Sequence, residues 1–200
     1  MIWFGLEALF ILAFWLWRRG RVRTAVERFV HKMEVRVLSE DPEVKWVGPF
    51  LSDGEIERLK RRARPHFRRS KVTRERGREG LCDDIRTSET ATLSGFRFFP
   101  IVPIIKAKAA HLIDRPVSHI EILQVVRYRE GQEYGLHLDG IDFDRFPKER
   151  GRGQRTHTVL VYLEEPISGS GTTDFPKLEL SVAPERGAAI VFTNSHPDGT

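Results

Sequence analysis

Hydrophobic residues change their spacing along this chain, and the change divides it into three parts. Residues 1–17 are almost wholly apolar, interrupted by Gly5 and Glu7, and such a run predicts a helix. Over residues 21–35 the apolar positions return every three or four residues, which predicts an amphipathic helix. From about residue 118 the spacing falls to two, which is typical of β-strands.

Several elements have recognisable boundaries. The segment Ser52–Glu55 is a capping box that opens a helix through about Arg64. A second helix is expected from Pro100 to Ile113, with prolines in its first turn. A polar loop is expected over 70–84, and short strands over 45–51, 119–129, 133–138, 156–163, 178–183 and 188–193. Helices followed by short strands predict an α+β fold in which helices pack on a double-stranded β-helix, or jelly roll.

Size and charge restrict the possible partners. Two hundred residues suit one domain with an appendage. The net charge is +5, with much of the basic excess between Arg18 and Arg78. Such a balance can attract nucleic acid, anionic lipid or an acidic substrate, but no zinc-finger or RNA-recognition pattern is present, so nucleic acid is not expected as a partner. Cys82 is the single cysteine, which excludes an internal disulfide and mildly favours a reducing compartment.

The N-terminal apolar run predicts a single-pass membrane anchor over residues 1–17, followed by a basic juxtamembrane helix or linker over 18–44. As a helix the run would extend about 24 Å, short of the ~30 Å hydrocarbon core of a bilayer. Arginines directly after it could close that gap by snorkelling. A cleaved signal peptide and a short amphipathic anchor are the alternatives, although neither a basic start nor a small-x-small cleavage site is evident.

The strongest candidate chemistry lies between Gln124 and Asp139. Two strands are expected here, joined by a tight turn at Glu130-Gly131, and the second carries His137 and Asp139 two residues apart. Alternating side chains on a strand would place both groups on one face. A histidine and a carboxylate side by side supply two of the three ligands of a non-haem Fe(II) site. The spacing alone is weak, because a structural His–Asp pair has the same pattern.

The surrounding residues make the pattern specific. Residues 124–139 resemble the prolyl 4-hydroxylase branch of the 2-oxoglutarate- and Fe(II)-dependent dioxygenases, whose core is roughly Q-x-x-x-Y-x-x-G-x-x-Y-x-x-H-x-D. Further matches follow in order: the G-x-R-x-x-T-x-L-x-Y-L pattern at 153–163, a degraded G-E-T-x-F-P at 171–176, and P-x-x-G-x-A-x-x-F at 184–192. Upstream, Arg86-Thr87-Ser88 and the opening at 48–52 also fit. The resemblance covers residues 45–200, which we therefore expect to form a dioxygenase domain.

The resemblance implies hydroxylation of peptidyl proline, with Fe(II), 2-oxoglutarate as cosubstrate and ascorbate as reductant. His137 and Asp139 would bind the iron. Tyr128 and Thr173 would bind the cosubstrate, although Tyr128 could equally be a core tyrosine, and the segment around Thr173 departs from the family pattern. Arg155 and Arg86 would hold the proline-containing peptide or protein substrate, and the 70–84 loop would fold over it.

The third iron ligand is not evident. In the family a distal histidine, and later a basic residue for the far carboxylate of the cosubstrate, follow the last matched strand. Counting from Phe192, both are expected beyond Thr200, so the domain is expected to be truncated at its C-terminus. His196 is the alternative ligand, within a second H-x-D that Pro197 places in a loop. His119 and Glu121 also share a two-residue spacing but match no family position.

Two other functions remain open: a related oxygenase acting on another substrate, and a catalytically inactive or truncated oxygenase-fold binding module. Localisation is also contested. Positive charge after the apolar run favours a cytoplasmic catalytic part. The resemblance favours the endoplasmic reticulum, with membrane attachment through the N-terminal segment, and this is the location we expect.

Overall fold

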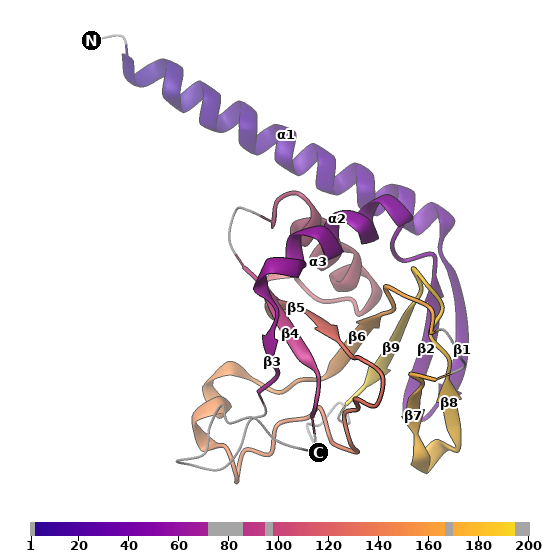
Figure 1. Ribbon diagram of the computed structural model, residues 1–200. Coiled ribbons are helices and arrows are strands. Elements are labelled where there is room, and N and C mark those ends of the chain that lie inside the picture. The colour runs from indigo at the N-terminus through magenta and orange to yellow at the C-terminus, as the bar shows by residue number, and fades with distance from the viewer. Residues whose placement is uncertain (1–2, 72–85, 95–97, 167–169, 195–200) are drawn as a thin grey trace.

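The computed structural model describes residues 3–71, 86–94, 98–166 and 170–194, and places helices at one end and strands at the other (Figure 1). The α-helices are α1 (Trp3–Lys32), α2 (Asp53–Ala63) and α3 (Ile101–Leu112). The strands are β1 (Glu34–Glu40), β2 (Glu43–Gly48), β3 (Arg68–Arg69), β4 (Glu89–Leu93), β5 (Leu123–Arg127), β6 (His157–Val161), β7 (Thr173–Phe175), β8 (Leu180–Val182) and β9 (Ala189–Thr193).

The strands form antiparallel sheets. One sheet has the order β1-β2-β9-β6, a second the order β3-β4-β5, and β7 pairs with β8. Every one of these pairings is antiparallel. Helices packed on antiparallel sheets confirm the α+β expectation. The capping box is also confirmed: the Ser52 hydroxyl accepts a bond from the Glu55 amide, and the Glu55 carboxylate accepts one from the Ser52 amide.

The register between β6 and β9 separates two cores. Thr158 lies opposite Phe192, and Val159 lies opposite Val191. Because side chains alternate along a strand, neighbouring residues face opposite ways. The main core under α2 and α3 takes in Val159, Val161, Ala189 and Val191. A smaller core takes in Leu160, Tyr162, Phe175, Leu180, Val182, Ile190 and Phe192, between this sheet and the β7–β8 pair.

Gly187 joins the turn before β9 to the segment that precedes α2. Its carbonyl accepts bonds from the amides of Phe50 (2.7 Å) and Leu51 (2.9 Å), and its own amide donates to the Tyr162 carbonyl (2.9 Å). The backbone has a φ of +85°, and a Cβ atom here would lie 2.7 Å from the Leu51 carbonyl oxygen. Both the left-handed conformation and the close approach therefore require glycine.

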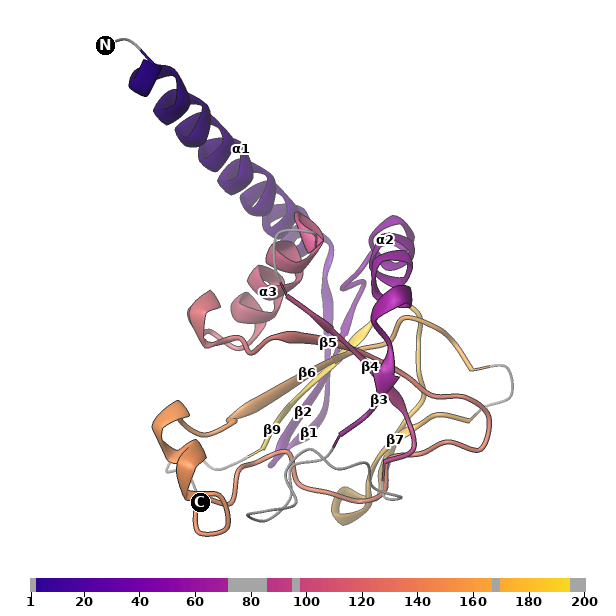
Figure 2. The same ribbon diagram turned by 60° about the vertical axis from the view of Figure 1, so that its left-hand side comes forward.

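The N-terminal region differs from the expected helix and linker. Helix α1 runs without a break from Trp3 to Lys32 and, in both views, its N-terminal part projects away from the strands (Figures 1 and 2). Residues 34–40, expected as a helix end and linker, instead form β1. The alternation of Val35 and Val37 with charged residues was the strand signal. No helix in the described part of the chain is both long and apolar enough to cross a membrane.

A buried ion pair ties the three α-helices together. The ammonium group of Lys108 on α3 contacts the Glu55 carboxylate (3.1 Å) and donates to the Phe50 carbonyl (2.8 Å). The ammonium also lies 5.5 Å from the ring centre of Phe29 on α1. Burial alone would raise the pKa of Glu55, but the hydrogen bond from the Ser52 amide and the charge of Lys108 outweigh it and hold this pKa below its ordinary value.

Replacing Lys108 with alanine should lower the free energy of unfolding by about 3–5 kcal/mol, because the Glu55 carboxylate would stay buried without its partner. Lys60→Ala is the matched control. Lys60 is more exposed and pairs with Glu57 and Glu164 at the surface, so its loss should cost less than about 1 kcal/mol. Urea unfolding of both variants measures the difference, and equal losses would contradict a structural role for the buried pair.

Candidate metal and cosubstrate site

The candidate metal ligands lie on the irregular segment between β5 and β6. In both views this orange segment lies at the end of the molecule away from the helices (Figures 1 and 2). The expected turn at Glu130-Gly131 is present, with the Gln132 amide bonded to the Arg129 carbonyl. The strand expected over 133–138 is wrong: only Tyr134 makes a bridge, with Arg86. The Gly135 carbonyl accepts a bond from the His137 ring.

His137 and Asp139 nevertheless point toward one another. The His137 Nε2 atom lies 3.2 Å from Asp139 Oδ1, and each side chain is about one-third exposed. The hydrogen bond to Asp139 raises the pKa of His137 above its ordinary value, with a smaller contribution from the Gly135 carbonyl. The same bond lowers the pKa of Asp139, and the Thr158 hydroxyl lowers it further. The predicted juxtaposition is therefore confirmed without the predicted strand.

The remaining polar atoms of the pair are already bonded. His137 Nδ1 donates to the Gly135 carbonyl at 2.8 Å, so Nε2 is the ring nitrogen that faces Asp139. The Thr158 hydroxyl donates to Asp139 Oδ2 at 2.7 Å. The Asn194 side-chain amide in turn donates to the Thr158 oxygen at 2.9 Å. Nε2 and Oδ1 bond to each other, and a cation that replaced the proton between them would meet one nitrogen and one oxygen donor, a set that fits Fe(II).

Gln154 holds this segment against the start of β6. Its side-chain carbonyl accepts the Ile141 amide (2.7 Å), and its side-chain amide donates to the Ile141 carbonyl (2.9 Å). Gly140, directly before Ile141, passes close to the Asn194 carbonyl: a Cβ atom there would lie 3.5 Å from that oxygen. Asp139 is therefore fixed from both sides, through Thr158 on β6 and through the Gln154 clamp.

The other expected site residues, Arg86, Arg155, Tyr128 and Thr173, make different contacts. Arg86 lies over the Tyr134 ring (4.6 Å), which itself stacks on His137. Arg155 pairs with Glu121 at 2.7 Å, and its charge contributes to the lowered pKa of Asp139. Tyr128 is 46% exposed, which excludes the core alternative.

Thr173 is placed differently from the other candidates. Its hydroxyl accepts a bond from Tyr162 (2.9 Å) beside the smaller core. Sequence reasoning did not assign roles to Tyr134, Thr158 or Asn194. The first two lie at fixed positions of the motifs, which could have marked them, whereas no sequence signal distinguished Asn194.

Two of the expected metal ligands, His137 and Asp139, are brought together in the described part of the chain. No group of three or more His, Cys, Asp or Glu side chains suited to a metal occurs among the described residues. His196, the alternative third ligand, and most of the 70–84 loop lie outside them. His119 ends a short 3-10 helix (Val117–His119), and Glu121 pairs with Arg155, so these two residues do not form a second ligand pair.

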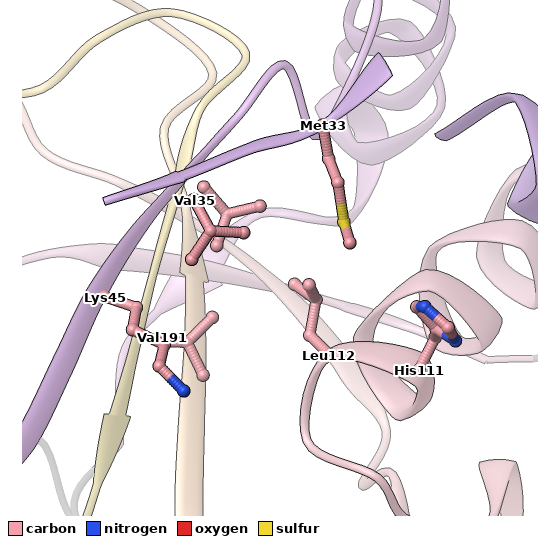
Figure 3. A pocket seen from close by; sticks show the side chains of 7 residues that line it. Met33, Val35, Lys45, His111, Leu112 and Val191 are labelled. Atoms are coloured by element: carbon pink, nitrogen blue, oxygen red, sulfur yellow. The ribbon is translucent and has the colours of Figure 1, made fainter. Parts of the chain in front are cut away.

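A cavity of about 150 Å³ lies elsewhere, between the sheet and the helices (Figure 3). It is lined by Met33, Val35, Lys45, Val47, His111, Leu112 and Val191. Val191 belongs to the main core, on the face of β9 opposite to Phe192. The cavity therefore lies apart from the His137–Asp139 pair and contributes nothing to the candidate site.

Comparison with known proteins points to the segment that contains His137 and Asp139. Residues 123–198, which contain both candidate ligands, match the family model for the 2OG-Fe(II) oxygenase superfamily. This stretch of the chain therefore carries the pattern of a 2OG-Fe(II) oxygenase domain. The chain is similar to prolyl 4-hydroxylase 1 of Arabidopsis thaliana, with 33% identity over 184 residues, covering 85% of this chain and 64% of the relative.

Two further proteins are similar to this chain. Prolyl 4-hydroxylase subunit alpha-1 of Gallus gallus is 36% identical over 153 residues, covering 75% of this chain and 29% of the subunit. A crystal structure of the viral collagen prolyl hydroxylase vCPH from Paramecium Bursaria Chlorella virus-1, a 2OG complex, matches with a TM-score of 0.58 and 29% identity, over 78% of this chain and 80% of that one. The chain thus spans less than two thirds of these plant and chicken relatives.

Replacing Thr158 with valine should weaken divalent metal binding by about 10- to 100-fold, because Asp139 Oδ2 loses the donor that orients the carboxylate. Thr193→Val is the matched control, since Thr193 lies on the same sheet and its hydroxyl bonds to the Glu43 carbonyl. Isothermal titration with Co(II) gives both affinities. Equal affinities would contradict the orienting role of Thr158.

Metal affinity should also fall as the pH is lowered. Because Asp139 raises the pKa of His137 above 6.5, the imidazole keeps its proton at a higher pH than an ordinary histidine. A bound metal must displace that proton, so affinity should rise with pH until His137 is neutral, with proton release on binding. Co(II) titrations in two buffers of different ionisation enthalpy measure this release. A pH-independent affinity without proton release would exclude His137 as a ligand.

Proposed function

We propose that this chain is a prolyl 4-hydroxylase-like dioxygenase that uses Fe(II) and 2-oxoglutarate to hydroxylate proline in a peptide or protein substrate. The proposal rests mainly on one observation: His137 Nε2 and Asp139 Oδ1 converge, while the Gly135 carbonyl and the Thr158 hydroxyl hold the other polar atoms of the two side chains. The names of the relatives supply the substrate class. The antiparallel sheets are consistent with the jelly-roll barrel expected around such a site.

The residues of the chain have separate tasks in this proposal. The Gly135 carbonyl keeps the proton of His137 on Nδ1, and Thr158 keeps Asp139 turned toward the metal position. Iron, when bound, would couple oxidative decarboxylation of 2-oxoglutarate to proline hydroxylation, giving succinate and carbon dioxide. Tyr128 and Thr173 remain the candidates for cosubstrate binding, and Arg86 and Arg155 for substrate binding. Ascorbate as reductant, the anchor over residues 1–17 and an endoplasmic reticulum location stay predictions from the sequence.

Fe(II)-dependent release of succinate in the presence of a proline-rich peptide tests the proposal. His137→Ala should abolish turnover because it removes one of the two ligands, whereas His119→Ala should leave turnover unchanged. Hydroxyproline in the peptide is the decisive product. Circular dichroism of both variants verifies that they are folded.

The other outcomes identify the alternatives. Succinate release without hydroxyproline on a panel of proline peptides would indicate a related oxygenase with another substrate. The two-ligand set of the described residues favours the binding module as the second candidate. A folded chain that binds no Fe(II) or Co(II) would support that module and overturn the enzyme assignment.

A further inference from the structure

The planar groups of Arg86, Tyr134 and His137 form a stack, and His137 is one of the two candidate metal ligands. The Tyr134 and His137 rings lie 3.6 Å apart between centroids, with an angle of 15° between their planes. The Arg86 guanidinium lies over the Tyr134 ring, with its central carbon 4.6 Å from the ring centre. Arg86 precedes β4, whereas Tyr134 and His137 follow β5, so two segments distant in sequence contribute to the stack.

The backbone around the stack is tightly held. Arg86 and Tyr134 pair through an isolated bridge. The Thr87 amide donates to the Glu133 carbonyl (3.0 Å), and the Glu133 amide donates to the Thr87 hydroxyl (2.8 Å). These bonds fix the backbone at Glu133 and Tyr134, although this segment is not part of a regular strand.

The Arg86 side chain is anchored below the stack. Its Nε atom donates to the Ser88 hydroxyl at 3.3 Å. Ser88 is fully buried and bonds to the Ser70 hydroxyl (2.8 Å), which also contacts the Thr90 hydroxyl (2.7 Å). Buried hydroxyls bonded to one another have few alternative arrangements, so they give the guanidinium a fixed support on the β3–β4 pair.

We propose that Tyr134 is a positioning residue for the metal site, whose ring sets the plane of the His137 imidazole while Arg86 holds the tyrosine in place. This proposal rests on the proposed function, because it takes His137 as a metal ligand. His137 lies on irregular backbone, where no ladder restrains it, and the stack restricts rotation of its ring. The face of the tyrosine ring supplies this restraint. The Tyr134 hydroxyl is therefore not needed for metal binding.

Co(II) affinity of the full chain without substrate or cosubstrate tests the proposal. Tyr134→Leu should weaken binding by about 10- to 100-fold, the range typical of groups that orient metal ligands. Tyr134→Phe keeps the ring and should bind like the wild type. Arg86→Met should weaken binding less than Tyr134→Leu, and it serves as the test if Tyr134→Leu does not fold. Thermal unfolding without metal verifies that each variant retains its structure.

The outcomes separate this inference from the proposed function. Weak binding by Tyr134→Leu together with normal binding by Tyr134→Phe supports positioning by the ring. Wild-type Co(II) affinity in Tyr134→Leu overturns positioning by the ring, and so does wild-type affinity in Arg86→Met if that variant alone folds. The enzyme assignment stays intact in either case if His137→Ala does not bind Co(II). Equal losses in Tyr134→Phe and Tyr134→Leu also overturn it, because the hydroxyl would then be responsible. Absence of Co(II) binding in the wild type overturns both.

Discussion

The register between β6 and β9 is the constraint on which the site depends. With Thr158 opposite Phe192, the Thr158 hydroxyl faces Asp139, and Val159 packs beneath the helices. A shift by one residue would exchange these faces, bury the hydroxyl in the main core and leave Asp139 without its donor. Core packing and the position of the Asp139 carboxylate are therefore fixed by one set of backbone hydrogen bonds. The close contact at Gly187, directly before β9, holds that strand to the segment leading into α2.

The sequence was most informative where a short motif determines the local structure or chemistry. The Ser52–Glu55 capping box located the start of α2, and the order of motifs located the His137–Asp139 pair. In both cases the chemistry depends on a short spacing that is visible in the sequence. Such features could be predicted because they need little information about distant parts of the chain.

Features that depend on distant partners could not be predicted. The strand expected over 133–138 had the right alternation, but the Gly135 carbonyl bonds to a side chain instead of a neighbouring strand. Arg155 was expected to be available to substrate, yet its position relative to Glu121 appears only in three dimensions. The contact of Arg86 with the Tyr134 ring likewise joins residues that are 48 positions apart in the sequence. Asn194 supports Asp139 only through Thr158, so no local pattern marks it.

Strand β1 has a consequence for the behaviour of the molecule in concentrated solution. It is the outer strand of the four-stranded sheet, and nearly all of its residues are exposed, including Val35 and Val37. An open edge of this kind can add a strand from another molecule. Here Glu34, Arg36 and Glu40 lie along the same strand, and charged groups on an edge disfavour such pairing. The charges of β1 thus oppose self-association at the outer edge of this sheet.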